Sequence, residues 1–145
     1  MKRIAMLAAL VAVVLIAYRM MSGESGDSKD GIKFYEGSWE SVLAKAKAEQ
    51  KPIFLDIYAS WCGPCKMLKK KSFSDKEVGT FFNTNFVNVS FDGENGDGGM
   101  LAAKYHISGY PTLIVLDKNG NLVSTHVGFL PPDELLILGK QSVRN

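Results

Sequence analysis

The sequence predicts a single α/β domain, in which helices cover both faces of a central mixed β-sheet. The chain has 145 residues, enough for one ordinary domain once the first twenty or so are set aside. Along it, the patterns run helix, strand, helix, strand, helix, strand, strand, helix. Such an order calls for a layered α/β fold with parallel first strands and an antiparallel closing pair.

The N-terminus has the order of a secretory signal. Lys2 and Arg3 precede an unbroken apolar run over residues 4–17, and Arg19 can extend its charge toward lipid headgroups. We expect residues 1–21 to be an uncleaved signal anchor, with a cleaved signal peptide as the alternative. The positive end stays in the cytoplasm, so the domain lies outside, on the periplasmic side of the inner membrane in a double-membrane bacterium.

Residues 22–31 contain no large apolar side chain and are predicted to be a flexible linker, followed by the domain over residues 32–145. The whole chain carries 17 basic and 15 acidic residues. Because Lys2, Arg3 and Arg19 all precede the linker, the domain is nearly neutral. A neutral domain gives no indication of a nucleic-acid partner.

The first helix and the first strand have clear local signals. Ser38 can cap a helix that ends near Pro52, with apolar residues at helical spacing: Trp39, Val42, Leu43 and Ala46. Residues 53–58 form a short, nearly all-apolar run that is typical of a strand covered on both faces. Asp56 is the one charged residue in that run.

The middle of the chain predicts two helices, a strand and a loop. After the cysteines, residues 66–71 continue helically, and Ser74 with Glu77 forms a capping-box pattern that starts another helix. Residues 86–91 alternate as a strand does. The glycine-rich and acidic residues 92–99 predict a loop, and residues 100–105 give one or two helical turns.

The last third predicts a hairpin and a helix. The sequence predicts strands over residues 113–116 and 122–127, and Asn119-Gly120 between them strongly indicates a hairpin turn. Pro131 and Pro132, followed by two acidic residues, start a final amphipathic helix.

Two cysteines three positions apart at a strand-to-helix junction indicate redox chemistry. Cys62 falls at the helix N-terminus, where unpaired N–H groups stabilise a thiolate, so it is the candidate nucleophile. Cys65 lies one turn further on and is the candidate resolving thiol. A structural zinc site is the alternative, but only His106 and His126 could complete it, twenty residues apart. We therefore expect no metal.

The motif Trp61-Cys62-Gly63-Pro64-Cys65-Lys66 resembles the active site of the thioredoxin family. Asp56 stands six residues before the first cysteine, as in that family. Gly109-Tyr110-Pro111-Thr112 is similar to the family's cis-proline loop, and Gly128 follows the last strand pair. The resemblance covers residues 52–136 and implies the thioredoxin fold, with the cysteine pair as the redox centre and no cofactor.

The resemblance assigns further residues to substrate binding. Pro111 in cis would lay the backbone of Tyr110 beside Cys62, where it can pair with a substrate strand; an ordinary loop proline is the alternative. Trp61 and Tyr58 would form an apolar platform beside the disulfide, or be simple core residues. Gly63, Pro64 and Gly128 complete this set, and Pro64 favours a reducing potential in the family.

Asp56 has a role that its surroundings also suggest. A carboxyl in an apolar strand should have a raised pKa, so Asp56 can take the proton of Cys65 through water; a merely structural aspartate is the alternative. The chain departs from the family at Asn88, which stands where a buried lysine usually partners this aspartate. Tyr110 is also bulkier than the aliphatic residue usual before the cis-proline.

These features together predict an exported, monomeric protein-disulfide reductase that cycles between a Cys62/Cys65 dithiol and a disulfide. The substrates would be proteins that contain disulfides, and the resemblance implies a membrane thiol carrier as electron donor. A disulfide oxidase or isomerase is an alternative that differs only in redox potential. A non-catalytic thioredoxin-fold chaperone or scaffold is a second alternative, which the intact cysteine pair disfavours.

Overall fold

The structure is a computed structural model that describes residues 30–144. The predicted anchor or signal at residues 1–21, and most of the predicted linker, lie outside the described residues. Gly31, which the sequence placed in the linker, is buried, and a Cβ built on it would lie 2.4 Å from the carbonyl oxygen of Phe73. Gly31 is therefore part of the packed domain. Within residues 30–144, no helix has the length and apolar character needed to span a bilayer.

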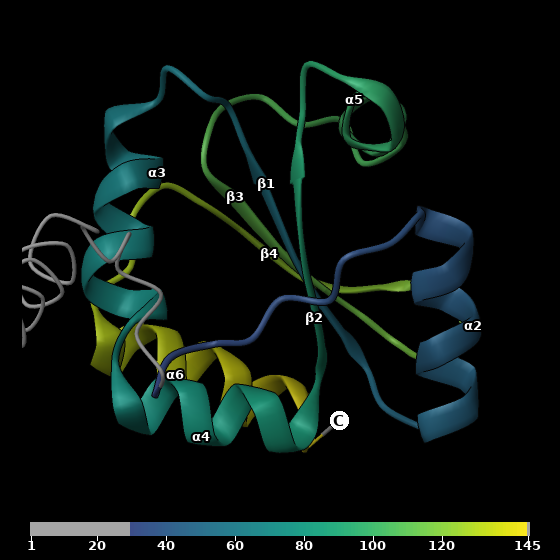
Figure 1. Ribbon diagram of the computed structural model, residues 1–145, viewed down its shortest axis with the longest axis horizontal. Coiled ribbons are helices and arrows are strands. Elements are labelled where there is room, and N and C mark those ends of the chain that lie inside the picture. Colours follow the sequence, from purple (N-terminus) through teal and green to yellow (C-terminus); the bar gives the residue numbers. More distant parts are fainter. Residues whose placement is uncertain (1–29, 145) are drawn as a thin grey trace, which may run out of the picture.

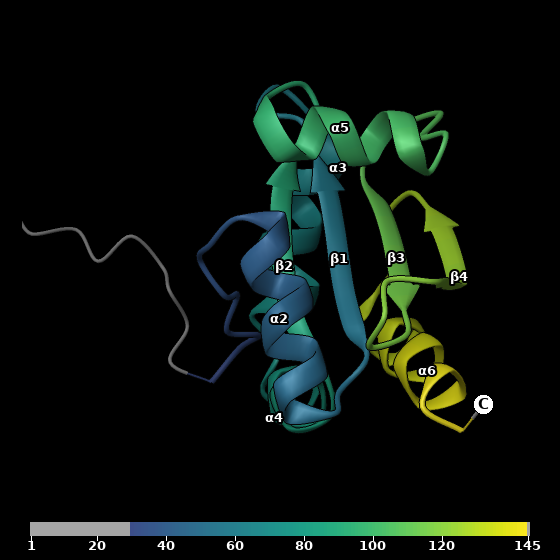
Figure 2. The same ribbon diagram turned by 90° about the vertical axis from the view of Figure 1, so that its right-hand side faces the viewer.

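The elements follow the predicted order, with two helices between the first two strands and a π-helix between those two helices. They are α2 (Trp39–Glu49), β1 (Ile53–Tyr58), α3 (Gly63–Leu68), the π-helix η1 (Lys69–Phe73), α4 (Lys76–Asn85), β2 (Val87–Asp92), α5 (Gly96–Lys104), β3 (Thr112–Leu116), β4 (Leu122–Val127) and α6 (Pro132–Ser142). The four strands form one sheet in the order β2-β1-β3-β4, which Figure 2 shows from left to right. β1 runs parallel to β2, and the other two pairings are antiparallel, as predicted.

The sheet separates two hydrophobic cores. On one face α3, α4 and α6 cover a cluster centred on Phe54 and Phe82, and on the other face α2 and α5 cover a cluster centred on Leu55 and Ile57 (Figure 1). Alternate residues of β1 thus point into different cores, which explains why its sequence is apolar at nearly every position. The prediction of a strand buried on both faces is confirmed.

Helix α4 starts one residue later than the capping box indicated. Asp75 is its N-cap, with a carboxylate oxygen that accepts the N–H of Val78 at 3.0 Å. The hydroxyl of Ser74 instead donates to the carbonyl oxygen of Lys70 at 2.5 Å. The reason is the π-helix η1, which continues the preceding helix to Phe73 and has Ser74 as its C-cap. Ser74 therefore ends one helix and Asp75 begins the next.

Helix α5 begins at Gly96, inside the segment predicted as a loop. Gly98 permits this, since a Cβ on it would lie 1.9 Å from the carbonyl oxygen of Asp92. The first turn of α5 therefore packs directly on the end of β2. Asp97 in that turn accepts the backbone N–H of Trp39 at 2.6 Å and so connects α5 to α2. Glycine is unfavourable within helices, which is why composition favoured a loop.

The hairpin between β3 and β4 forms as predicted. The carboxylate of Asp117 accepts the N–H groups of Asn119 and Asn121 at 2.8 and 2.9 Å, and Gly120 adopts a φ of +86°. Asn-Gly supplies the positive φ that the turn needs. β4 is an edge strand, and its residues are exposed or half-buried.

Candidate active site

The end of β1 leads into α3 and delivers the two cysteines to one end of the sheet. Cys62 is the N-cap of α3, and its Sγ accepts the backbone N–H of Cys65 at 3.1 Å. The two cysteines form a disulfide with Cα atoms 5.3 Å apart, so the structure is of the oxidised protein. Both are buried, at 3% and 8% exposure.

Gly63 and Pro64 form the first turn of α3 directly after Cys62. Pro64 suits this turn because its φ is fixed and an N–H at this point would have no helical partner. Gly63 is exposed, and a Cβ built on it would meet no atom within 4 Å. The surface beside the disulfide is therefore open to a partner molecule.

Asp56 lies in the middle of β1, paired in register with Ser90 of β2. The hydroxyl of Ser90 donates to its Oδ2 at 2.7 Å, whereas Oδ1 is buried without a hydrogen-bond partner in the described chain. Burial raises the pKa of Asp56 to about 7, against the opposing effects of the Ser90 hydrogen bond and the Lys69 ammonium. The sequence indicated this direction.

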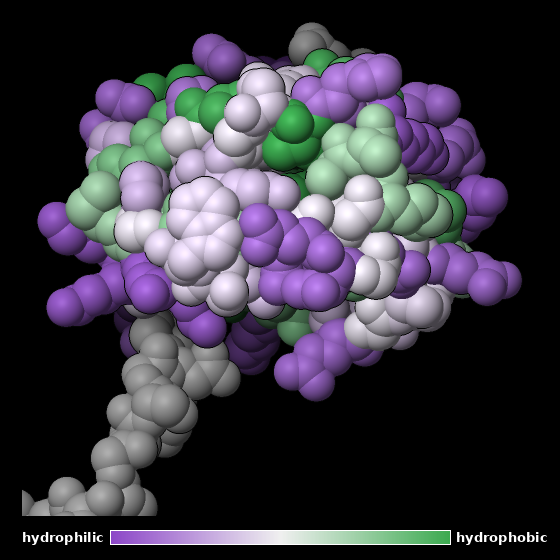
Figure 3. All heavy atoms as spheres, turned by 90° about the horizontal axis from the view of Figure 1, so that it is seen from above, coloured by the Kyte–Doolittle hydropathy of each residue, from purple (hydrophilic) through white to green (hydrophobic). Residues whose placement is uncertain are grey.

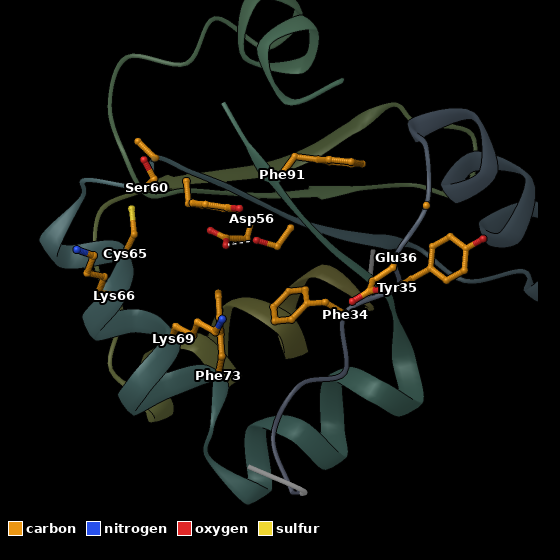
Figure 4. Close-up of a pocket in the computed structure, with 14 residues that line it drawn as sticks. Phe34, Tyr35, Glu36, Asp56, Ser60, Cys65, Lys66, Lys69, Phe73 and Phe91 are labelled. Atoms are coloured by element: carbon orange, nitrogen blue, oxygen red, sulfur yellow. Dashed lines mark hydrogen bonds between the residues drawn. The ribbon is translucent and has the colours of Figure 1, made fainter. Parts of the chain in front are cut away.

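A cavity of about 460 Å³ connects Asp56 to the disulfide. Its lining includes Asp56, Ser90, Cys65 and Lys69, and a wall formed by residues 34–37 (Figure 4). A water molecule occupies about 30 Å³ in the liquid, so there is room for several. Cys65 and the Asp56 carboxyl thus face a common space in which water can carry a proton between them.

Asn88, which stands where the family usually has a buried lysine, bonds to a residue other than Asp56. The register sets Asn88 opposite Phe54, and its amide donates to the side-chain oxygen of Asn83 at 3.2 Å. Ser90 is the β2 residue opposite Asp56, and the nearby cation is Lys69 at the start of η1. Sequence reasoning missed both, because only the register of the strands assigns Ser90 to Asp56.

The loop before β3 has the predicted backbone form. The Tyr110-Pro111 peptide bond is cis, and the Thr112 hydroxyl donates to the Gly109 carbonyl oxygen at 2.7 Å, closing the turn. The N–H of Gly128, whose φ is +107°, donates to the Pro111 carbonyl oxygen at 2.8 Å. The loop is thereby fastened to the chain that leaves β4.

Aromatic rings surround the disulfide. Tyr58 and Tyr110 pack against the buried cluster of Ala59 and the two cysteines. The ring of Trp61 is 67% exposed and stands edge-on to that of Tyr110, with centroids 6.0 Å apart. The predicted substrate-binding residues thus lie around one end of the sheet, and Asp56 lies further along β1. Their roles in binding remain predictions.

A further residue, Glu94, joins this group. The indole N–H of Trp61 donates to both carboxylate oxygens of Glu94, at 3.1 and 3.2 Å. The sequence placed Glu94 only in a loop, and no local pattern connects it to a residue 33 positions away.

Two histidines were considered as zinc ligands. His106 lies just after α5, and His126 lies in β4. Within residues 30–144, no three histidine, cysteine or acidic side chains group as metal ligands do.

Comparison with known proteins places these features in a family. The model of the thioredoxin-like domain matches residues 39–142. Thiol:disulfide interchange protein DsbD of Yersinia pestis is 33% identical over 100 residues, which are 67% of this chain and 16% of that protein. The protein of the same name from Campylobacter jejuni is 30% identical over 75% of this chain and 19% of its own length. The chain thus spans less than a fifth of these curated relatives.

Solved structures agree with this assignment. A "putative disulphide-isomerase" from Bacteroides thetaiotaomicron is 41% identical, with a TM-score of 0.71 over 80% of this chain and 96% of its own. A thioredoxin from Thermus thermophilus, 23% identical over 78% of this chain and 88% of its own, shares the fold with a TM-score of 0.69. The chain therefore belongs to the thioredoxin-like family, with Cys62 and Cys65 as its disulfide-forming pair.

Proposed function

We propose that this protein reduces disulfide bonds in other proteins on the outer side of the cytoplasmic membrane. The observation that carries the proposal is the position of the Cys62–Cys65 disulfide at the start of α3. The Cys65 N–H that donates to the Cys62 sulfur can stabilise a thiolate there once the disulfide is reduced. The helix N-terminus acts in the same direction.

The reaction proceeds in two exchanges. The Cys62 thiolate attacks a substrate disulfide: a bond forms between Cys62 and one substrate sulfur, the substrate S–S bond breaks, and the other substrate sulfur leaves as a thiolate and takes up a proton. The Cys65 thiolate then attacks Cys62, forming the Cys62–Cys65 bond and releasing the second substrate thiolate. Two electrons pass to the substrate, and the protein becomes oxidised.

Asp56 serves as the proton acceptor for Cys65 in the second exchange. Its pKa of about 7 lets it accept a proton near neutral pH, and the shared cavity supplies the water path. Substrate binds on the exposed surface formed by Gly63 and Pro64, beside the disulfide. Tyr110 lies two residues ahead of β3, outside the sheet register, where its backbone can pair with a substrate strand.

Residues 1–21 hold the protein to the membrane as an anchor, and the residues between this anchor and the packed Gly31 form the linker. A membrane thiol carrier returns electrons to the cysteine pair. The positive-then-apolar order of residues 1–21 supports this location. Fractionation of cells expressing the full chain should place it in the membrane, and protease added to spheroplasts should degrade it. A protein released intact into the soluble periplasmic fraction would indicate a cleaved signal instead.

The activity is tested by reduction of insulin with dithiothreitol as electron source, followed by turbidity. We expect the wild type to accelerate it and Cys62→Ser to abolish the acceleration. Activity that survives in Cys62→Ser would refute the assignment. The Cys65→Ser variant should accumulate a mixed disulfide with its natural substrate, which mass spectrometry can then identify.

Disulfide isomerisation or oxidation is the second candidate, favoured by the name of the Bacteroides relative, which is 41% identical. The potential of the Cys62/Cys65 couple against glutathione decides between them. A value near that of thioredoxin, roughly −270 mV, supports the reductase, and a value near roughly −180 mV or above supports the isomerase or oxidase.

A further inference from the structure

We propose that Glu94 is a specificity-determining residue, which orients Trp61 beside the disulfide and favours substrates with a basic residue next to their reactive cysteine. The inference rests on the proposed function, because it concerns the choice of substrate at the same site. Four features of the described structure support it.

The first feature is the direct contact with the active-site motif. Trp61 precedes Cys62, and its indole N–H has both oxygens of the Glu94 carboxylate within hydrogen-bond distance. An exposed ring at a docking surface would otherwise rotate freely, at a cost in entropy when a partner binds. The hydrogen bond fixes the ring before the partner arrives.

The second feature is the rigidity of the loop that carries Glu94. The Asp92 carboxylate accepts the N–H of Glu94 at 3.0 Å and the side-chain amide of Asn95 at 2.8 Å. Gly93 lies against the ring of Tyr110, since a Cβ built there would approach that ring to 2.6 Å. One loop therefore contacts both Trp61 and Tyr110, two of the aromatic residues beside the disulfide.

The third feature is that the charge of Glu94 is not neutralised within residues 30–144. None of the salt bridges found there involves Asp92, Glu94 or Asp97. Asp92 and Asp97 are half-buried and accept backbone N–H groups of Glu94 and Trp39, whereas Glu94 is exposed. A carboxylate that binds only a neutral indole N–H keeps its full negative charge. It can attract a lysine or arginine of a bound segment.

The fourth feature is the arrangement of charge around the site. The exposed lysines near the cysteines project from α3 and η1, which cover one face of the sheet, whereas Glu94 precedes α5 on the other face (Figure 1). Viewed from the end where β1 leads into α3, near-neutral and hydrophobic residues lie directly beside strongly hydrophilic ones (Figure 3). Because Glu94 contacts Trp61 and the lysines lie on α3 and η1, the Trp61 side of the site is the side suited to a basic substrate residue.

The test uses two disulfide peptides that differ only in the residues next to the reactive cysteine, lysine in one and glutamate in the other. The measured quantity is the ratio of the rate constants with which the reduced protein attacks the two peptides. Glu94→Gln keeps an oxygen acceptor for Trp61 but removes the charge. We expect it to lower the lysine-to-glutamate ratio by up to about fivefold, the range of an exposed ion pair.

Glu134→Gln is the matched control, because Glu134 is exposed in the first turn of α6 and outside the site. Its ratio should equal that of the wild type. An unchanged ratio in Glu94→Gln, or an equal fall in Glu134→Gln, would overturn the inference while leaving the proposed function intact. If the wild type attacks neither peptide, the proposed function fails as well.

The orienting role has its own readout. The chain contains two tryptophans, so two indole N–H signals are expected in an NMR spectrum, and Trp61→Phe identifies the one from Trp61. That signal should stay near its position in Glu94→Gln and shift in Glu94→Ala. Glu94→Ala should also slow the attack on both peptides, in addition to the lower lysine-to-glutamate ratio that it shares with Glu94→Gln. An unmoved signal in Glu94→Ala would exclude the orienting role.

Discussion

Replacement of Asp56 by asparagine should make the stability of the protein less sensitive to pH. An unfolded aspartate has a pKa of about 3.9, and burial raises the pKa of Asp56 to about 7 in the folded state. Between these values the folded protein binds more protons than the unfolded chain. The free energy of unfolding therefore falls as pH rises from about 4 to about 7 and stays low above that range.

The size of the effect follows from the shift. Three pKa units at about 1.4 kcal/mol each give about 4 kcal/mol for complete ionisation. At pH 5 the unfolded aspartate is already ionised, so part of this loss has occurred, and the change between pH 5 and pH 9 is about 3 kcal/mol. Asparagine removes this dependence, so the stability of Asp56→Asn relative to the wild type should increase by about 3 kcal/mol over that interval.

The pH-dependent difference is more informative than the absolute stability. Asp56 Oδ1 is buried without a hydrogen-bond partner in the described chain, so the amide group of asparagine would bury unpaired N–H donors. That cost of about 1–3 kcal/mol does not vary with pH and cancels in the comparison. Every other ionisable group is common to both proteins, so its contribution cancels too.

The assay is urea unfolding of both proteins at pH 5 and pH 9 with the Cys62–Cys65 disulfide intact. Keeping the disulfide prevents titration of the thiols beside Asp56 from contributing. If the difference between variant and wild type is the same at both pH values, the carboxyl is not held protonated by burial. The proton-acceptor role proposed for Asp56 would then lose its physical basis.

Two other changes have definite expected results. Lys69→Met should raise the pKa of the Asp56 carboxyl further, since the ammonium lowers it now, whereas Lys71→Met should leave it unchanged; the pH profile of insulin reduction measures this, and equal profiles for both variants would contradict it. Gly98→Ala should lower the free energy of unfolding by about 2 kcal/mol or more, because its Cβ would overlap the end of β2. Gly99→Ala, with no atom nearer than 3.7 Å to the new Cβ, is the control for urea unfolding.

The sequence was most informative where the determinants are local. The cap at Ser38, the two-sided burial of β1, the Asn-Gly hairpin and the redox pair at the start of α3 each depend on residues within a few positions of one another. It was less accurate where a tertiary contact overrides local preference. Gly98 is a poor helix residue, yet α5 extends through it because only glycine fits against the end of β2.

The same distinction applies within the site. The direction of the Asp56 pKa shift was predictable, because desolvation is its largest cause and the apolar sequence of β1 already implied burial. The two groups that oppose this shift were not predictable. Ser90 lies in β2, 34 positions away, and Lys69 lies in a π-helix that no sequence pattern predicted. Ser90 and Lys69 both favour the ionised carboxylate and so limit how far burial can raise its pKa. The local motif therefore supplies the sulfur chemistry, and long-range packing determines the pH at which Asp56 can assist it.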